Sequence, residues 1–166
     1  MRKFCATILF VITFCFGGTT LAEYLIRVDF REARLYLYDD GREVGNFPVA
    51  LPMVNPKLPI IGIVERVEEN PYWAPTKATR EYYFKKSGVE LPKLIRPGDP
   101  RNAMGKRKIR IAFDDAHVNQ TIRIHGTNQE ESIGRRVSRG CIRMRNDDIK
   151  KLSEIIRGKK TVVVFS

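Results

Sequence analysis

Cysteine is scarce in this chain, and its positions exclude a framework of stabilising disulfides. The 166 residues include three cysteines, Cys5, Cys15 and Cys141. The first two lie in an N-terminal segment that we expect to be removed, which leaves Cys141 alone. A single cysteine cannot form an intramolecular disulfide, so in an exported protein it indicates an intermolecular bridge or a reactive thiol. A buried, inert cysteine is the remaining alternative.

Long apolar runs are also lacking. The longest, Phe4–Phe16, is shorter than the about 20 residues that a membrane-spanning helix needs. It follows a short basic start and precedes small residues that end at Ala22. This order predicts a secretory signal peptide over residues 1–22, cleaved after Ala22, and one domain over residues 23–166. We therefore expect an exported protein of the periplasm or cell envelope, in contact with membrane only through an uncleaved signal segment.

Acidic residues are outnumbered, with 19 Asp and Glu against 30 Lys and Arg and a net charge of +11. Residues 1–22 hold two basic residues and no acidic one, so the domain keeps a net charge of +9. The basic residues are scattered, which excludes a nucleic-acid footprint. A basic exported domain instead favours anionic surroundings such as cell-wall polymers or membrane surfaces.

Metal ligands are few, since the sequence has two histidines, His117 and His125. Together with Cys141 they show none of the paired spacings typical of zinc sites, so we expect no metal. Redox chemistry of a dithiol needs a second cysteine, which the domain lacks. The sequence therefore predicts a protein without metal or cofactor.

Alternation of apolar and polar residues is frequent, and it predicts a mainly β fold with one clear helix near the C-terminus. Asp40-Gly41 is typical of a hairpin turn. The helix is expected over Asn146–Arg157, with Asn146 as its N-cap and Gly158 as its end. Ser87–Gly105 lacks periodicity and is expected to be either a functional loop or disordered. Strands are expected over residues 23–30, 34–38, 43–51, 62–68, 108–113, 121–125 and 161–165, and a short helix, with Thr79 as its cap, over residues 79–86.

His125 ends one of these predicted strands. Ile122 and Ile124 would share one face, which places Arg123 and His125 on the opposite, polar face. Gly126 follows directly and lets the chain turn. A strand-anchored histidine that substrate can reach, with a pKa near neutral, suits a general base. An ordinary structural histidine is the alternative.

Cys141 follows Gly140 in a second polar stretch. If residues 141–145 are extended, the thiol shares a face with Arg143 and Arg145, and such cations would lower its pKa. Gly140 would let substrate approach closely, and backbone N–H groups there could stabilise an oxyanion. An arginine beside the thiol could hold a substrate carboxylate. A cysteine with a histidine is a recognised nucleophile and base.

The run from Ile124 to Leu152, IHGTNQEESIGRRVSRGCIRMRNDDIKKL, closely resembles the catalytic motif of the L,D-transpeptidases, the YkuD-domain family. In that motif a histidine precedes a Ser/Thr-His-Gly-Cys segment, and His125, Ser138, Gly140 and Cys141 stand in register with it. Arg139 departs from it, because many members have a histidine there. A looser similarity extends over most of the domain.

The resemblance implies a β-barrel or sandwich that acts on peptidoglycan. Cys141 would attack the third residue of a stem tetrapeptide, release D-alanine and form a thioester, which an amine then resolves. His125 would be the base. The residues expected to contact substrate or the oxyanion are Gly140, Ser138, Arg143, Arg139 and Gly126.

Three functions remain open on this basis. The first is an L,D-transpeptidase of cell wall biogenesis and cell shape, which forms 3-3 cross-links or attaches an envelope protein. Its partners would be peptidoglycan stem peptides and, for attachment, that envelope protein, with no nucleic acid. The second keeps the Cys141 thiol as an L,D-carboxypeptidase or a wall-protein amidase. The third is an inactive basic module that binds the wall.

Overall fold

The computed structural model describes residues 23–118 and 122–166, and these form the mainly β fold that the sequence predicts. The expected signal peptide, residues 1–22, lies outside the described residues, as does Thr121, the first residue of one expected strand. No helix in the described part of the chain is long and apolar enough to cross a membrane.

The strands begin and end close to where the alternation predicts them. Asp40 and Gly41 both have positive φ angles, 45° and 75°, and form the two-residue hairpin turn expected between β2 and β3. Along the chain the elements are β1 Tyr24–Asp29, β2 Arg34–Asp39, β3 Arg42–Pro48, β4 Leu51–Pro52, β5 Ile60–Glu69, α1 Lys77–Ser87, β6 Arg107–Ala112, β7 Arg123–His125, a 3-10 turn Glu130–Ser132, β8 Arg136–Ser138, β9 Ile142–Arg143, α2 Asn146–Ile155 and β10 Thr161–Phe165.

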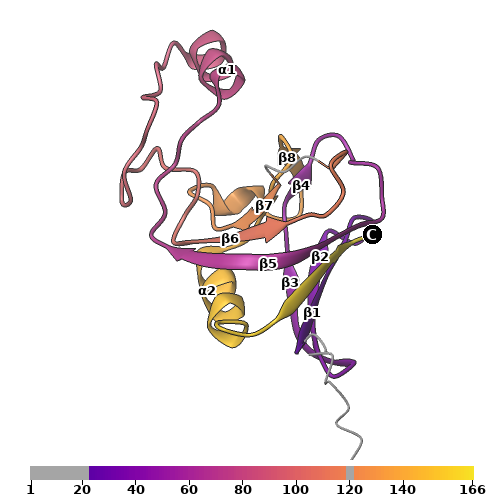
Figure 1. The fold of residues 1–166 in the computed structure, drawn as a ribbon. Helices are drawn as coiled ribbons and strands as arrows, with labels where there is room; N and C mark the ends of the chain where they lie inside the picture. Colours follow the sequence, from indigo (N-terminus) through magenta and orange to yellow (C-terminus); the bar gives the residue numbers. More distant parts are fainter. Residues whose placement is uncertain (1–22, 119–121) are drawn as a thin grey trace, which may run out of the picture.

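Eight strands form one curled sheet in the order β3-β2-β1-β10-β5-β6-β7-β9, and β4 pairs with β8 in a second, two-stranded sheet (Figure 1). Most neighbours are antiparallel, but β1 with β10, β7 with β9, and β4 with β8 are parallel. Parallel neighbours need a crossover connection, and between β7 and β9 this connection is residues 126–141. The crossover carries the Ser138–Cys141 segment and returns it beside His125.

The core lies between the curled sheet and α2, which packs beside β6 (Figure 1). Ile149 and Leu152 of α2 are fully buried, and so are Ile109 of β6 and Ile124 of β7. Because side chains alternate along a strand, burial of these isoleucines turns the intervening residues of β6 and β7 to the other face of the sheet. That polar face is where the candidate site lies.

Residues 70–106, between β5 and β6, form a separate lobe that carries α1, which stands away from the sheet in Figure 1. The lobe has its own small apolar cluster of Trp73, Leu91, Ile95 and Ala103. Backbone hydrogen bonds join Trp73 and Ile95 in both directions, at 2.9 and 2.8 Å. Ser87–Gly105 is therefore organised around this cluster, which excludes disorder, one of the two alternatives expected for this segment.

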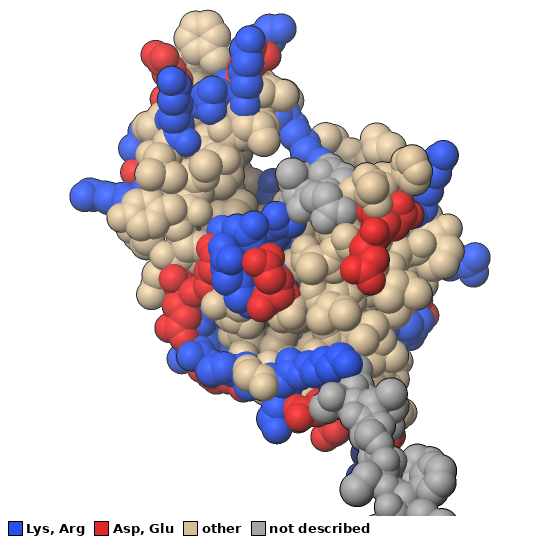
Figure 2. Space-filling view, in the orientation of Figure 1, with Lys and Arg blue, Asp and Glu red and all other residues tan. Residues whose placement is uncertain are grey.

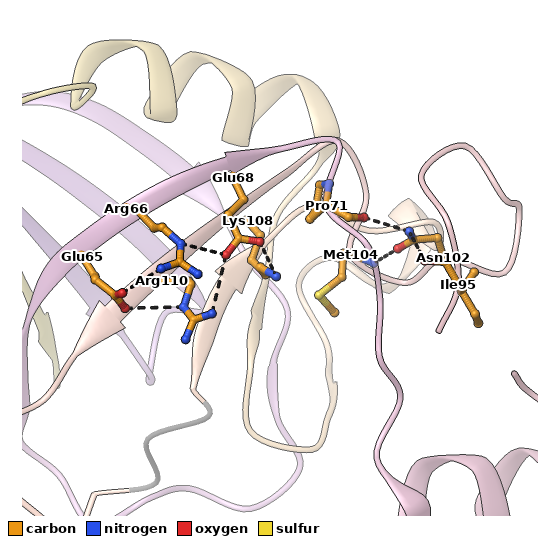
Figure 3. A network of polar contacts seen from close by, with 9 residues as sticks. All are labelled: Glu65, Arg66, Glu68, Pro71, Ile95, Asn102, Met104, Lys108 and Arg110. Carbon is orange, nitrogen blue, oxygen red and sulfur yellow. Dashed lines mark hydrogen bonds and ion pairs between the residues drawn. The ribbon is translucent and has the colours of Figure 1, made fainter. Parts of the chain in front are cut away.

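Asn102 ties the lobe together from within (Figure 3). Its buried side chain donates to the carbonyls of Pro71 at 3.0 Å and Arg96 at 3.1 Å, and it accepts from the N–H of Met104 at 2.9 Å. These bonds join the two ends of the lobe near β5 and β6.

Helix α1 begins earlier than the sequence predicts, at Lys77, and its N-cap is Thr76 rather than Thr79. The hydroxyl of Thr76 accepts from the N–H of Thr79 at 3.2 Å, which is the bond that an N-cap makes. The helix buries none of its residues, so apolar spacing could not locate its start.

The prediction that Asn146 caps α2 is wrong. Arg145 holds the N-cap position and makes no side-chain cap. The Asn146 side chain accepts from the N–H of Lys106 at 2.8 Å and donates to the carbonyl of Thr127 at 2.7 Å and to Glu130 at 3.0 Å. It thereby joins the start of β6, the turn after His125 and the start of α2.

Gly126 is packed tightly against this amide. A Cβ atom at Gly126 would overlap Oδ1 of Asn146, and one at Gly105 would overlap the same atom. Gly126 is thus required for close packing behind the turn that follows His125, more than for the turn itself.

Replacement of Asn146 by alanine should lower the free energy of unfolding by roughly 1–2 kcal/mol, because several hydrogen-bond partners lose their bond to this side chain. Denaturant unfolding measures this. Asn128→Ala is the matched control, since that exposed amide makes one bond, to the carbonyl of Pro100, and should change stability by less than about 0.5 kcal/mol. Equal effects of the two changes would contradict this role for Asn146.

Candidate active site

The candidate site is built on the parallel pair β7 and β9. Ile124 lies opposite Ile142, His125 lies opposite Arg143, and the N–H of Met144 donates to the carbonyl of His125 at 2.9 Å. Residues paired in this way point to the same face of a sheet. Continuing the register by one residue brings Cys141 opposite Arg123, on the face that also holds His125.

Backbone spacing places Cys141 and His125 within reach of each other. Adjacent strands lie about 4.8 Å apart and two residues span about 6.6 Å along a strand, so the two Cα atoms are roughly 8 Å apart. Two side chains that leave the same face at this separation can meet at one reacting carbonyl.

A supporting segment, residues 49–53, holds the cysteine loop from the other side. Ala50 exchanges two backbone hydrogen bonds with Arg143, at 2.9 and 3.0 Å. The N–H of Met53 donates to the carbonyl of Ser138 at 3.0 Å. Both ends of the Ser138–Arg143 stretch are therefore fixed.

Ser138 organises the loop in front of the thiol. It is 3% exposed, its hydroxyl donates to the carbonyl of Cys141, and it accepts from the N–H of Gly140 at 3.3 Å. Gly140 has a φ angle of +143°, a conformation that residues with a side chain rarely adopt. Ser138 and Gly140 therefore set the loop's shape.

His125 is 3% exposed, which differs from the expected placement on an open polar surface. Its Nδ1 lies 2.5 Å from the carbonyl oxygen of Gly126. Because a carbonyl oxygen only accepts, Nδ1 carries the proton, and the neutral ring keeps a lone pair on Nε2. In this tautomer Nε2 is the ring nitrogen that can accept a proton, and the backbone of Ala103 also acts on the ring.

The pKa of His125 is about 4, chiefly because burial disfavours the charged ring. The positive charges of Arg143 and Lys108 lower this pKa further, and the backbone of Gly126 opposes them. The expectation of a pKa near neutral is therefore wrong, and His125 is neutral at physiological pH.

Cys141 is half-buried, and burial raises the pKa of its thiol. The backbone N–H of Arg123 and the positive charge of Arg123 oppose this rise in pKa, followed by Arg143 and Lys108. The expectation that nearby cations produce a low pKa is wrong, because burial outweighs them. Thiol and imidazole are both neutral before reaction.

Arg143 shares the face of Cys141, and its guanidinium donates to the side chain of Gln129 at 3.3 Å. Arg145 stands at the N-cap of α2 with an extended backbone, φ −60° and ψ 149°, and its side chain is exposed. Burial of Ile142 and Met144 agrees with the predicted alternation over residues 141–145.

Arg139 is directed toward the lobe of residues 70–106. Its guanidinium lies 4.2 Å from the centre of the Tyr82 ring and donates to the carbonyl of Ala78 at 3.1 Å. This cation–π contact and hydrogen bond join the cysteine loop to α1. Arg139 is also absent from the charges that act most on Cys141.

Charged residues of β5 and β6 continue the polar face beyond His125 (Figure 3). Lys108 lies opposite His125 and forms an ion pair with Glu68 at 2.6 Å. Arg110 lies opposite Arg123 and pairs with Glu65 at 3.4 Å and with Glu68 at 3.7 Å. The two glutamates therefore draw these cations toward β5.

Arg123 is the residue of this face that motif reasoning did not select. Strand alternation already placed it beside His125, and the missing information was the register of β7 against the cysteine loop. Sequence spacing alone does not give that register, because Cys141 lies sixteen positions after His125.

Within residues 23–118 and 122–166, no three His, Cys, Asp or Glu side chains lie together as metal ligands would.

A cysteine and a histidine on a shared face of a sheet can act as a nucleophile and its base. Residues 23–164 match the family described as the L,D-transpeptidase catalytic domain, YkuD. The chain belongs to this family, which confirms the resemblance seen in residues 124–152.

Curated relatives agree with this assignment. "Probable L,D-transpeptidase ErfK/SrfK" of Escherichia coli (strain K12) is 42% identical over 130 residues, which cover 76% of this chain and 39% of that protein. "Probable L,D-transpeptidase YcfS" of the same strain is 36% identical over 145 residues, which cover 84% of this chain and 43% of that protein. The chain thus spans about two fifths of the length of these relatives.

Solved structures show the same fold. The catalytic domain of an Enterococcus faecium L,D-transpeptidase acylated by ertapenem matches with a TM-score of 0.59 and 16% identity, over 88% of this chain and 98% of that one. An L,D-transpeptidase from Mycobacterium smegmatis matches with a TM-score of 0.58 and 14% identity, over 87% and 59%. These likenesses concern the fold, and they confirm the predicted class of β structure.

The imidazole of His125 should titrate with a midpoint near pH 4, which NMR of the ring protons measures directly. The chain has two histidines, so His117→Gln identifies the signal. The pKa of a histidine in the unfolded chain is about 6.5, so between about pH 4 and 6.5 the unfolded chain binds more protons than the folded chain. The free energy of unfolding therefore decreases as pH falls through this window. A midpoint near 6.5 would contradict the buried, neutral ring.

Loss of the Arg139 side chain should loosen α1. Arg139→Ala removes the cation–π contact with Tyr82 and the bond to Ala78, and we expect roughly tenfold faster amide exchange over residues 77–87. Hydrogen–deuterium exchange with mass spectrometry measures this. Arg145→Ala, which removes an exposed arginine, is the control, and equal exchange in both variants would show that Arg139 does not hold α1.

Proposed function

We propose that this chain is an exported L,D-transpeptidase that acts on peptidoglycan stem tetrapeptides, with Cys141 as nucleophile and His125 as general base. The placement of both side chains on one face, in a member of this family, carries the proposal. We also propose that residues 1–22 direct export and that the domain works in the periplasm or cell envelope.

In the first half-reaction the thiol loses its proton to Nε2 of His125 as sulfur attacks the carbonyl of the third stem residue. The amide bond to the terminal D-alanine breaks, and its nitrogen takes the proton from the imidazolium. D-alanine leaves, and the stem remains as a thioester on Cys141. A neutral thiol and a neutral imidazole suit this transfer, because the proton moves only when the substrate is present.

The loop around Gly140 supports the oxyanion that forms during attack. Its φ angle and the two hydrogen bonds of Ser138 fix the peptide groups before Cys141. We propose that N–H groups of this loop stabilise the oxyanion and that Arg143, on the same face, contacts the donor. Gly126 acts on His125 through its packing against Asn146.

In the second half-reaction an amine attacks the thioester, an amide forms, and the thiol regains its proton. The acceptor is the side-chain amine of another stem peptide, which gives a 3-3 cross-link, or the amine of an envelope protein. The net charge of the domain and the lysines and arginines over the α1 lobe (Figure 2) favour an anionic polymer as substrate.

We infer that residues 87–105 border the donor site. Their lobe is tied to the cysteine loop through the contact of Arg139 with Tyr82. Deletion within residues 87–105 should weaken binding of the donor stem peptide, and an unchanged affinity for that peptide would contradict this inference.

Product analysis by mass spectrometry tests the reaction. Residues 23–166 incubated with disaccharide-tetrapeptides should release D-alanine and form cross-linked dimers, and Cys141→Ala should form neither. His125→Gln should slow acylation by roughly a hundredfold to ten-thousandfold, because the base is lost.

Other outcomes distinguish the alternatives. Tripeptide without dimer would show hydrolysis, as in an L,D-carboxypeptidase, and would contradict transfer to a stem amine. No product that depends on Cys141, in a protein that still binds wall fragments, would overturn the enzymatic function and favour a binding module.

A further inference from the structure

The polar face contains a second residue whose Cα atom lies closer to that of Cys141, across the sheet, than the Cα atom of His125 does. We propose that Arg123 is a further catalytic residue, whose guanidinium and backbone N–H stabilise the thiolate of Cys141 during acyl transfer. This proposal rests on the function proposed above, since it concerns the same thiol.

Register gives the first argument. Continuing the pairing of β7 with β9 brings Arg123 directly opposite Cys141, so the two Cα atoms are about 4.8 Å apart, against roughly 8 Å for His125. The backbone N–H of Arg123 also faces the sulfur and is the strongest of the groups that favour the thiolate, with the positive charge of Arg123 next. One residue thus supplies both a dipole and a charge.

The fixed position of the Arg123 side chain gives the second argument. The guanidinium donates to the carbonyl of Ile122 at 2.7 Å, which holds it against β7. The side chain is half-buried, so its charge is screened less than that of an exposed arginine. A charge held in place before reaction needs no reorganisation when the anion forms.

Like charges are paired across β6 and β7. Arg123 lies opposite Arg110 on β6, and two like charges directly across a sheet repel. Glu65 and Glu68 offset the charge of Arg110 from the β5 side (Figure 3). On the other side of Arg123, toward β9, the position opposite it is Cys141, so formation of a thiolate there relieves the repulsion.

The chemistry shows why such a residue matters here. Burial disfavours both the thiolate and the imidazolium, so proton transfer from Cys141 to His125 creates two costly charges. A fixed cation beside sulfur lowers the cost of one of them. As sulfur bonds to the carbonyl carbon, the negative charge moves from sulfur to the carbonyl oxygen, and the thioester forms when this oxyanion collapses and D-alanine leaves.

Alkylation of Cys141 by iodoacetamide, followed by intact-mass analysis over a range of pH, tests the proposal without any stem peptide. An opposite charge shifts a pKa by about one unit or more, so Arg123→Gln should react roughly tenfold more slowly at a pH below the thiol pKa, and its profile should move to higher pH. Arg123→Lys, which keeps the charge, should recover most of the rate. Arg145→Gln, an exposed arginine four residues beyond the thiol, should leave the profile unchanged.

Thermal unfolding of each variant separates a structural loss from the electrostatic one. If Arg123→Gln does not fold, Arg123→Met removes the charge and keeps the apolar stem. An unchanged alkylation profile in a folded neutral variant would overturn the proposal, and weaker binding of stem peptide with that same profile would show that Arg123 contacts a substrate carboxylate instead.

The two proposals fail separately. A profile that depends on Arg123 in a protein that makes no cross-links would overturn transpeptidation and leave the role of Arg123 intact. Cross-linking by Arg123→Gln or Arg123→Met, with an unchanged pH profile of alkylation, would overturn the role of Arg123 and leave transpeptidation intact.

Discussion

The parallel pairing of β7 with β9 is the constraint on which the site depends. The crossover of residues 126–141 leaves the sheet after His125 and must return beside it. The hydrogen bond from the N–H of Met144 to the carbonyl of His125 joins the two strands after this return. Ala50 holds β9 from its other edge, and Asn146 holds the turn after His125. A shift of one residue in this register would turn the thiol to the apolar face.

Burial sets the chemical character of the pair. Burial favours the neutral forms of both His125 and Cys141. A neutral thiol reacts less readily with solutes and oxidants than a thiolate does, which suits the exported location that we propose for residues 23–166. Under the proposed mechanism, the cations of the polar face act on the reacting state, where charge develops.

Local patterns predicted much of the fold and of the site, because they depend on neighbours in sequence. Alternation located the strands, Asp40-Gly41 located a turn, and the family motif brought His125 and Cys141 together. What the sequence could not give depends on distant segments. The cap at Thr76 belongs to a helix without a buried face, Asn146 bonds to residues up to 40 positions away, and the effect of burial on the two pKa values arises only when the crossover closes.

The most direct test of the pair is the pH dependence of acylation of Cys141 by ertapenem, which acylates the related Enterococcus faecium domain. In the wild type the rate should be nearly constant above pH 5 and fall below it, with a midpoint near 4, as His125 gains a proton. In His125→Gln the rate should be low and rise with pH, because only the thiolate can react. The same profile in both proteins would contradict the assignment of His125 as the base.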